Sequence, residues 1–135
     1  MPKALSLLHV MLYRLLGGRL VGRVGKAPVL LLTTRGRKSG KSRTVPLLYL
    51  HDGDTFVVVA SNGGARSHPG WFFNVEAAGG GSVRIGRRRL EVSARTASPE
   101  ERERLWPAIV PLYKGYEAYQ ARTAREIPLV VLTPA

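Results

Sequence analysis

The sequence predicts a single α+β domain, mainly of antiparallel strands that close into a small barrel with flanking helices. The 135-residue chain contains short β-branched and leucine-rich runs separated by turn residues, a pattern typical of hairpin-linked strands. Apolar residues make up 44% of the chain, enough for a buried core. Short strands joined by hairpins favour a barrel over a doubly wound parallel sheet.

The strands are predicted from apolar runs bounded by turn residues. They are expected at residues 29–34, 44–51, 55–61, 82–86, 90–96 and 127–133. Asp52-Gly53 between the second and third runs, and the arginines 87–89 between the fourth and fifth, indicate hairpin turns. The sequence therefore predicts three strands, then two, then one.

Helices are expected in the gaps between these strands. Pro69 suits the start of a helix that runs to Gly79, with Ser67 or His68 as its cap. The segment 98–101, Ser-Pro-Glu-Glu, is a capping box that begins a second helix. Prolines 107 and 111 are expected to break or kink that helix.

The composition limits the possible partners. Lys and Arg number 21 and Asp and Glu 9, a formal charge of +12 that attracts nucleic acid, anionic lipid or phosphorylated small molecules. The absence of cysteine excludes disulfides and thiol chemistry and suits a reducing, cytoplasmic location. The three histidines lie far apart without nearby carboxylates, so we expect no metal site.

Residues 1–26 are expected to form an amphipathic helix and a connector, ahead of the barrel domain at 27–135. Leucines cover most of the predicted helix and several arginines follow it. Such a helix suits the surface of an anionic membrane, on the inner face of the cell membrane. Packing on the domain's own core is an equal alternative.

Residues 35–44, RGRKSGKSRT, carry five cations and no anion. They resemble the phosphate-binding loop of nucleotide hydrolases, but Arg35 stands where the first glycine is required. Thr44-Val45-Pro46 also resists the helix that should follow. What remains is a basic turn between two strands, suited to an anion or simply solvated.

Three further segments are candidates for a binding site. Residues 60–65, ASNGGA, could present backbone N–H groups to a ligand or form a plain loop. Trp71 and Asn74, three residues apart, could flank a flat ring, although core packing explains the tryptophan equally well. Tyrosines 113, 116 and 119 would share a helix face, where a cleft is favoured over a core.

Four stretches together resemble one family: TTRGRKSGKSRTVPLLYL, DGDTFVVVASNGGARSHPGWFFN, the tyrosine series and IPLVVL. This is the deazaflavin-dependent nitroreductase and quinone reductase family. The resemblance implies a split β-barrel, FMN-binding-like in fold. It also implies that the barrel binds coenzyme F420, an 8-hydroxy-5-deazaflavin, non-covalently and without a metal.

The resemblance also implies the site residues, by position. Arg37, Lys38 and Arg43 would bind the cofactor's phosphate and acidic oligoglutamate tail. The other implied cofactor-binding residues are Ser39, Thr44, Val45, Pro46, Ala60, Ser61, Asn62, Gly63, Gly64, Pro69, Trp71, Asn74 and Tyr116. Ser61 would orient the acceptor or supply a proton, and Tyr113, Tyr116 and Tyr119 would shape the acceptor pocket, so these four are the catalytic candidates.

The implied function is hydride transfer from reduced F420 to a quinone-like acceptor, with nitroaromatic compounds as further substrates. The deazaflavin would supply the hydride, so the protein needs to position it and exclude water. One alternative is a basic barrel that binds nucleic acid, but Trp71 and the tyrosines lie apart from the cations in sequence. Another alternative is a non-catalytic carrier of deazaflavin or lipid.

Overall fold

The computed structural model describes residues 23–24, 27–112 and 115–135. The predicted N-terminal helix and Tyr113 lie outside these residues. Within them, the strands form a single antiparallel sheet in the order β1-β2-β3-β4-β7-β6-β5. Their bounds are β1 Arg23–Val24, β2 Ala27–Arg35, β3 Ser42–Asp52, β4 Thr55–Val59, β5 Gly80–Ile85, β6 Arg88–Thr96 and β7 Leu129–Pro134.

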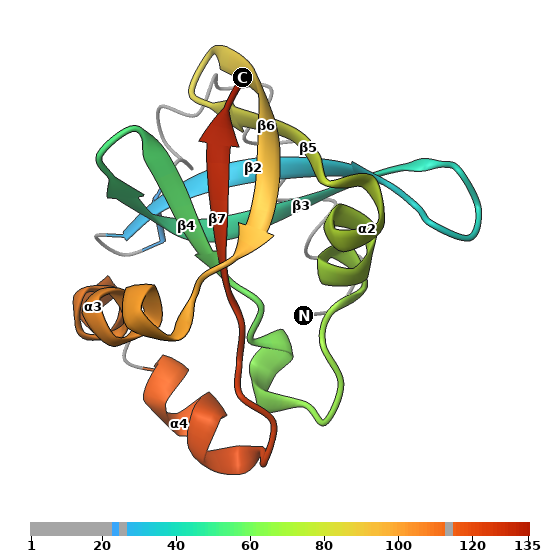
Figure 1. The fold of residues 1–135 in the computed structure, drawn as a ribbon. Helices are drawn as coiled ribbons and strands as arrows, with labels where there is room; N and C mark the ends of the chain where they lie inside the picture. Colours follow the sequence, from blue (N-terminus) through green and yellow to red (C-terminus); the bar gives the residue numbers. More distant parts are fainter. Residues whose placement is uncertain (1–22, 25–26, 113–114) are drawn as a thin grey trace.

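A second pairing closes this sheet into a barrel. β2 pairs with β3 on one side and, through Leu31, Leu32 and Thr33, with β5 on the other. The closed ring is therefore β2-β3-β4-β7-β6-β5, and the two-residue β1 extends it beside β2 (Figure 1). The predicted antiparallel barrel is confirmed, whereas β1 was not expected.

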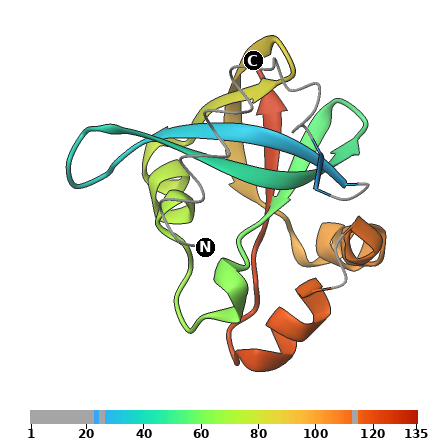
Figure 2. The same ribbon diagram turned by 180° about the vertical axis from the view of Figure 1, so that it is seen from behind.

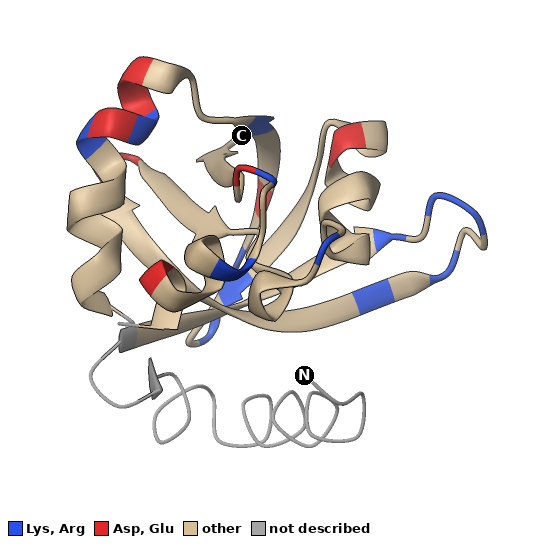
Figure 3. Cartoon of the chain, turned by 90° about the horizontal axis from the view of Figure 1, so that it is seen from below, with Lys and Arg blue, Asp and Glu red and all other residues tan. Residues whose placement is uncertain are grey.

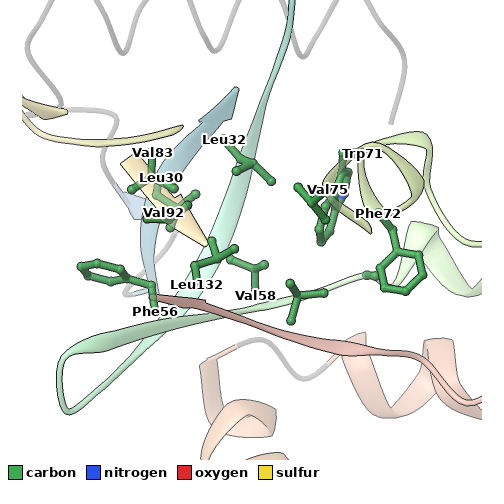
Figure 4. Packing of buried hydrophobic residues seen from close by; sticks show 12 residues of the cluster. Leu30, Leu32, Phe56, Val58, Trp71, Phe72, Val75, Val83, Val92 and Leu132 are labelled. Atoms are coloured by element: carbon green, nitrogen blue, oxygen red, sulfur yellow. The ribbon is translucent and has the colours of Figure 1, made fainter. Parts of the chain in front are cut away.

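Alternation along the strands separates two hydrophobic clusters. Leu30 and Leu32 of β2, with Phe56 and Val58 of β4, belong to the inner cluster, which fills the barrel (Figure 4). The residues between them point outward, as the two-residue period of a strand requires. On β4 and β7 these outward residues form an outer cluster with Leu105 and other residues of the C-terminal helices.

The helices cover one end and one outer face of the barrel. α2 (Gly70–Ala78) places Trp71, Phe72 and Val75 in the inner cluster. α3 (Pro99–Ile109), the 3-10 helix η2 (Val110–Leu112) and α4 (Gly115–Arg122) follow β6. α3 and α4 contribute to the outer cluster against β4 and β7 (Figures 1 and 2).

The helix ends agree with the sequence in part. The Ser98 hydroxyl accepts from Glu101 N–H and the Glu101 carboxylate accepts from Ser98 N–H, which confirms the capping box. For α2, neither Ser67 nor His68 is the cap, because Pro69 occupies that position without a side-chain bond.

The two prolines of the C-terminal region act differently. Pro107 lies inside α3, where it cannot donate a backbone hydrogen bond to the carbonyl of Glu103, an exposed residue. The helix ends instead at Ile109, just before the 3-10 segment that contains Pro111.

Candidate cofactor site

The basic segment forms the tip of the β2–β3 hairpin, which projects from the barrel (Figure 2). Its loop is closed by bonds from Gly36 N–H to Lys41 O and from Gly40 N–H to Gly36 O, each 2.8 Å. The cations along it are exposed and gather on the projecting tip (Figure 3). A strand, not a helix, follows Lys41, so the rejection of a nucleotide-hydrolase loop is confirmed.

Asn74 of α2 anchors this loop to the barrel. Its Oδ1 accepts from Arg37 N–H at 3.1 Å and from Arg37 Nη1 at 3.4 Å, and its Nδ2 donates to Thr34 Oγ1 at 3.3 Å. The amide is only 7% exposed. The Arg37 guanidinium also lies 4.9 Å from the ring centre of Phe73, a residue that the sequence analysis missed. Asn74 therefore holds Arg37 in place, with its amide oxygen already occupied.

β3 contributes Thr44, Val45 and Pro46 to the predicted site. The first part of this strand pairs with β2 and its last part pairs with β4. Residues 42–48 pair with β2, whereas pairing with β4 is confined to residues 49–52. β3 and β4 therefore separate just before β4 ends at Val59, and no described strand pairs with Pro46 at the edge of β3 that faces away from β2. Pro46, which lacks an N–H, suits such an edge.

The segment after β4 forms a tight loop. Ala60 is fully buried and its N–H donates to Pro128 O at 3.0 Å. Asn62, Gly63 and Gly64 then take positive φ values of 47°, 63° and 78° in the 3-10 helix η1. The Asn62 side chain donates to Ser67 O at 3.1 Å. The Ser61 hydroxyl makes no hydrogen bond within the described part of the chain and is half-buried, so it is available to a ligand.

Gly64 brings this loop into direct contact with α4. A Cβ at Gly64 would lie 2.8 Å from Tyr119 O and 3.0 Å from Tyr119 Cα. The loop and the tyrosine helix therefore pack backbone to backbone, and only glycine fits between them.

The tyrosines are divided between core and surface. Tyr116 is 6% exposed and belongs to the outer cluster, so the structure places it in a hydrophobic core, where the sequence favoured a cleft. Tyr119 is half-buried, with its ring centre 6.4 Å from that of Tyr116 and 5.8 Å from the Arg122 guanidinium carbon. Tyr119 is thus the described tyrosine at the edge of loop 60–64.

Pro69 and Trp71 lie where loop 60–68 enters α2. Pro69 is half-buried, and its carbonyl accepts from Phe72 N–H at 3.0 Å. Trp71 is 8% exposed and meets the Phe72 ring edge to face at 6.4 Å within the inner cluster. Core packing thus accounts for most of the Trp71 surface.

Arg125 holds loop 60–68 from the opposite side, and the sequence analysis missed it. Its guanidinium donates to Ala60 O at 3.2 Å, Ser61 O at 2.6 Å, Ala65 O at 2.8 Å and His68 Nδ1 at 2.8 Å. Because arginine can only donate, His68 Nδ1 must accept, with the ring neutral. Burial, helped by the nearby charge of Arg125, lowers the pKa of His68 and favours this neutral form.

The structure brings loop 60–64, the start of α2 and Tyr119 together beyond the end of β4, whereas the predicted cations lie on the β2–β3 tip. Two residues differ from expectation. Asn74 acts on the basic loop, and Tyr116 lies in a core. Two surface hollows of about 510 and 470 Å³ lie on other parts of the described chain, and of the predicted residues only Thr44 lines one of them. The described residues contain no group of three potential metal ligands. None of their helices is both long and apolar enough to cross a membrane.

Comparison with known proteins identifies the family. Residues 6–134 match the model of the family described as F420H(2)-dependent quinone reductase. An F420H(2)-dependent quinone reductase of Mycobacterium tuberculosis is 40% identical over 130 residues, covering 93% of this chain and 87% of the relative.

Two solved structures are also similar. One is described as an F420-H2 dependent reductase, with 42% identity, a TM-score of 0.71, and coverage of 78% of this chain and 93% of the other. The second, described as a domain-swapped dimer, has 38% identity, a TM-score of 0.73, and coverage of 93% and 96%. On its sequence and its split barrel, the chain belongs to the F420H(2)-dependent quinone reductase family.

Proposed function

We propose that this protein is an oxidoreductase that transfers a hydride from reduced coenzyme F420 to a quinone-like acceptor, with nitroaromatic compounds as further substrates. The observation that carries the proposal is the family match over residues 6–134. Two of the relatives, 40% and 42% identical to this chain, are described as F420-dependent reductases.

The residues present fit this cofactor at its anionic end. Coenzyme F420 bears a phosphate and an acidic tail, and the β2–β3 tip offers Arg37, Lys38 and Arg43 without a competing acid between residues 35 and 44. Arg37 is held by Asn74 and Phe73, so less freedom is lost when it binds an anion. Ser39 lies on the same tip and completes this part of the proposed contact.

The ring of the cofactor is proposed to lie where β3 and β4 separate. The edge of β3 at Thr44, Val45 and Pro46 would meet one side of a flat ring. Loop 60–64 would frame another side, and Arg125 donates to two of its backbone carbonyls, Ala60 O and Ser61 O. Pro69 and Trp71 lie where this loop enters α2. Binding is proposed to be non-covalent and to need no metal.

When bound, reduced F420 supplies the hydride, and the protein's own residues position the acceptor and exclude water. Reduction of a quinone places negative charge on its oxygen, which a preorganised hydroxyl stabilises by donating a hydrogen bond. Ser61 has a half-buried hydroxyl that is unengaged within the described chain. Tyr119 borders the same loop. Ser61 is therefore the proposed donor to the acceptor oxygen, and Tyr113 and Tyr119 are the proposed walls of the acceptor pocket. Tyr116 packs against Tyr119 from the outer cluster.

The basic, apolar N-terminal segment is proposed to bring the enzyme to an anionic membrane surface, where lipid-soluble quinones reside. The proposed location is thus cytoplasmic, with peripheral attachment at the inner face of the membrane. Among the remaining candidate partners, nucleic acid has no supporting observation.

An anaerobic assay with purified protein, reduced F420 and menadione tests the function, with return of the oxidised cofactor's absorbance as the readout. We expect turnover well above the protein-free rate. The double variant Arg37→Ala/Arg43→Ala should weaken F420 binding, measured separately by fluorescence titration, whereas Arg88→Ala on another hairpin should not. Ser61→Ala should lower kcat with little change in cofactor affinity.

Two results would contradict the proposal in different ways. Tight binding of F420 without turnover of any quinone would indicate a carrier. Neither binding nor turnover by a folded protein would remove the cofactor assignment altogether.

A further inference from the structure

A second basic site lies on the outer face of the barrel, apart from the β2–β3 tip. It is a hollow of about 510 Å³ over strands β2, β3, β5 and β6. Three arginines and three hydroxyl residues line it, together with apolar atoms of Leu31 and Val83. These polar residues are Arg84, Arg87, Arg89, Thr33, Thr44 and Ser82.

The backbone brings the three arginines together. Arg84 and Arg89 are direct partners in the β5–β6 ladder, and Arg87 lies in the two-residue turn between these strands. Gly86 begins that turn with a φ of 60° and its carbonyl accepts from Arg84 Nε at 3.1 Å. Like charges directly opposite in a ladder are destabilising. An anion bound between them would offset this cost.

The wall of the hollow carries a hydroxyl that forms no hydrogen bond with the described residues. Ser82 pairs with Thr33 in the β2–β5 ladder and is 6% exposed. Thr33 Oγ1 and Thr44 Oγ1 are hydrogen-bonded to each other at 2.9 Å, but the Ser82 hydroxyl has no such partner in the described chain. A buried hydroxyl without a partner is costly, and a ligand oxygen in the hollow would satisfy it.

The local charge balance also favours an anion. Glu91 lies opposite Ser82 in the β5–β6 ladder and lines the neighbouring hollow. Within the described residues, Glu91, Arg87 and Arg89 form no ion pairs. The described residues that line the hollow therefore include three arginines and no acidic side chain.

We infer that this hollow is a second anion site that binds a phosphate group, supplied by a soluble organic phosphate or by a lipid headgroup. Arginine binds phosphate oxygens with two donors at once, and the hydroxyl adds a donor that suits a third oxygen. The volume exceeds that of a phosphate alone and leaves room for an organic substituent beside Leu31. The site meets the proposed F420 site only at Thr44.

Titration of the ¹⁵N-labelled full-length protein with inorganic pyrophosphate, followed by NMR, tests the inference. Amide signals of residues 82–89 should shift in a saturable manner. The variant Arg87→Ala/Arg89→Ala should weaken this binding about tenfold or more, because it removes two charge-assisted contacts. Arg88→Ala is the matched control, since Arg88 neighbours both residues but pairs with Ile85 and does not line the hollow. It should leave the affinity within about twofold.

Two results would overturn the inference: shifts confined to residues 36–43, or equal affinities for the double variant and Arg88→Ala. All three positions are exposed, so the variants should fold, and circular dichroism checks this. Fluorescence titration with F420 should give the same affinity for Arg87→Ala/Arg89→Ala and for Arg88→Ala. This result would show that the second site is distinct from the proposed cofactor site.

A vesicle experiment identifies the source of the phosphate. Flotation with phosphatidylglycerol vesicles, against phosphatidylcholine vesicles, should distinguish Arg87→Ala/Arg89→Ala from Arg88→Ala if the ligand is a lipid headgroup. If the two variants float equally and only Arg88→Ala still binds pyrophosphate, the site binds a soluble organic phosphate. If the two variants behave alike in both the pyrophosphate titration and the flotation experiment, the proposed site is refuted.

Discussion

Replacing Arg125 by alanine should destabilise the protein and disorganise loop 60–68. The guanidinium bridges three backbone carbonyls and His68 Nδ1 in a segment that has few other tertiary bonds. Ala65 O is exposed, so water replaces that contact at little cost. The other three are partly buried. At about 1 kcal/mol for each net hydrogen bond, their loss predicts about 3 kcal/mol of destabilisation.

Urea unfolding followed by tryptophan fluorescence at pH 7 measures this free energy. For a chain of this length, about 3 kcal/mol corresponds to a fall in Tm of about 10 °C. Arg125→Lys should lose about 2 kcal/mol, since a single ammonium group cannot reproduce the planar set of contacts. Arg122→Ala is the matched control, because Arg122 is exposed with a described contact only to the Tyr119 ring, and its loss should cost less than about 0.5 kcal/mol.

The same cluster predicts a pH dependence. His68 has a folded-state pKa below its ordinary value of 6.5. The unfolded chain therefore takes up the proton first as the pH falls. This part of the stability is fully present above pH 6.5 and is lost as the pH falls from 6.5 through the folded-state pKa. His68→Asn, which keeps an acceptor for Arg125, should flatten the stability profile in that window.

The reasoning fails on one combination of results. If Arg125→Ala unfolds within about 1 kcal/mol of the wild type and binds F420 with unchanged affinity, the cluster does not hold the loop. A large loss of stability with unchanged F420 affinity would keep the structural role and remove the link to the cofactor.

Three further predictions concern other parts of the site and fold. Gly64→Ala should cost more than about 2 kcal/mol, whereas Gly63→Ala, with similar φ but open space around it, should cost about 1 kcal/mol by thermal unfolding. Equal costs would show that the close approach to α4 is unimportant. Asn74→Ala should weaken F420 binding about tenfold by releasing the basic loop, and an unchanged affinity would exclude that anchoring role. The pKa of Glu101 is lowered to about 2, first by its bond with Arg95, so the capping box should lose stability as the pH falls from 4.5 towards 2. Glu101→Gln should remove that part of the acid sensitivity, and a profile like that of the wild type would contradict it.

Local sequence determined most of the secondary structure and the chemical character of the site. Turn residues and alternating apolar runs identified the six barrel strands to within a few residues, because strand pairing and hairpin geometry depend on neighbouring residues. The capping box at Ser98 is a local hydrogen-bond pattern and was found for the same reason. The spacing and context of residues 35–44 sufficed to reject a nucleotide-hydrolase loop. Two local features were not predicted from the sequence: the two-residue strand β1 and the cap at Pro69.

Tertiary structure alone decided which side chains hold the site together. Arg125 contacts groups 57 to 65 residues earlier in the chain, and Asn74 reaches Arg37 across 37 residues. No local pattern distinguishes such an arginine or asparagine from a solvated one. Tyr116 has the same local spacing as Tyr119, yet the packing of α4 against the outer face of β4 and β7 buries it in the outer cluster. The hollow lined by Arg84, Arg87 and Arg89 likewise depends on tertiary structure, because Thr33 and Thr44 join the β5–β6 hairpin only where β5 pairs with β2 and β2 with β3.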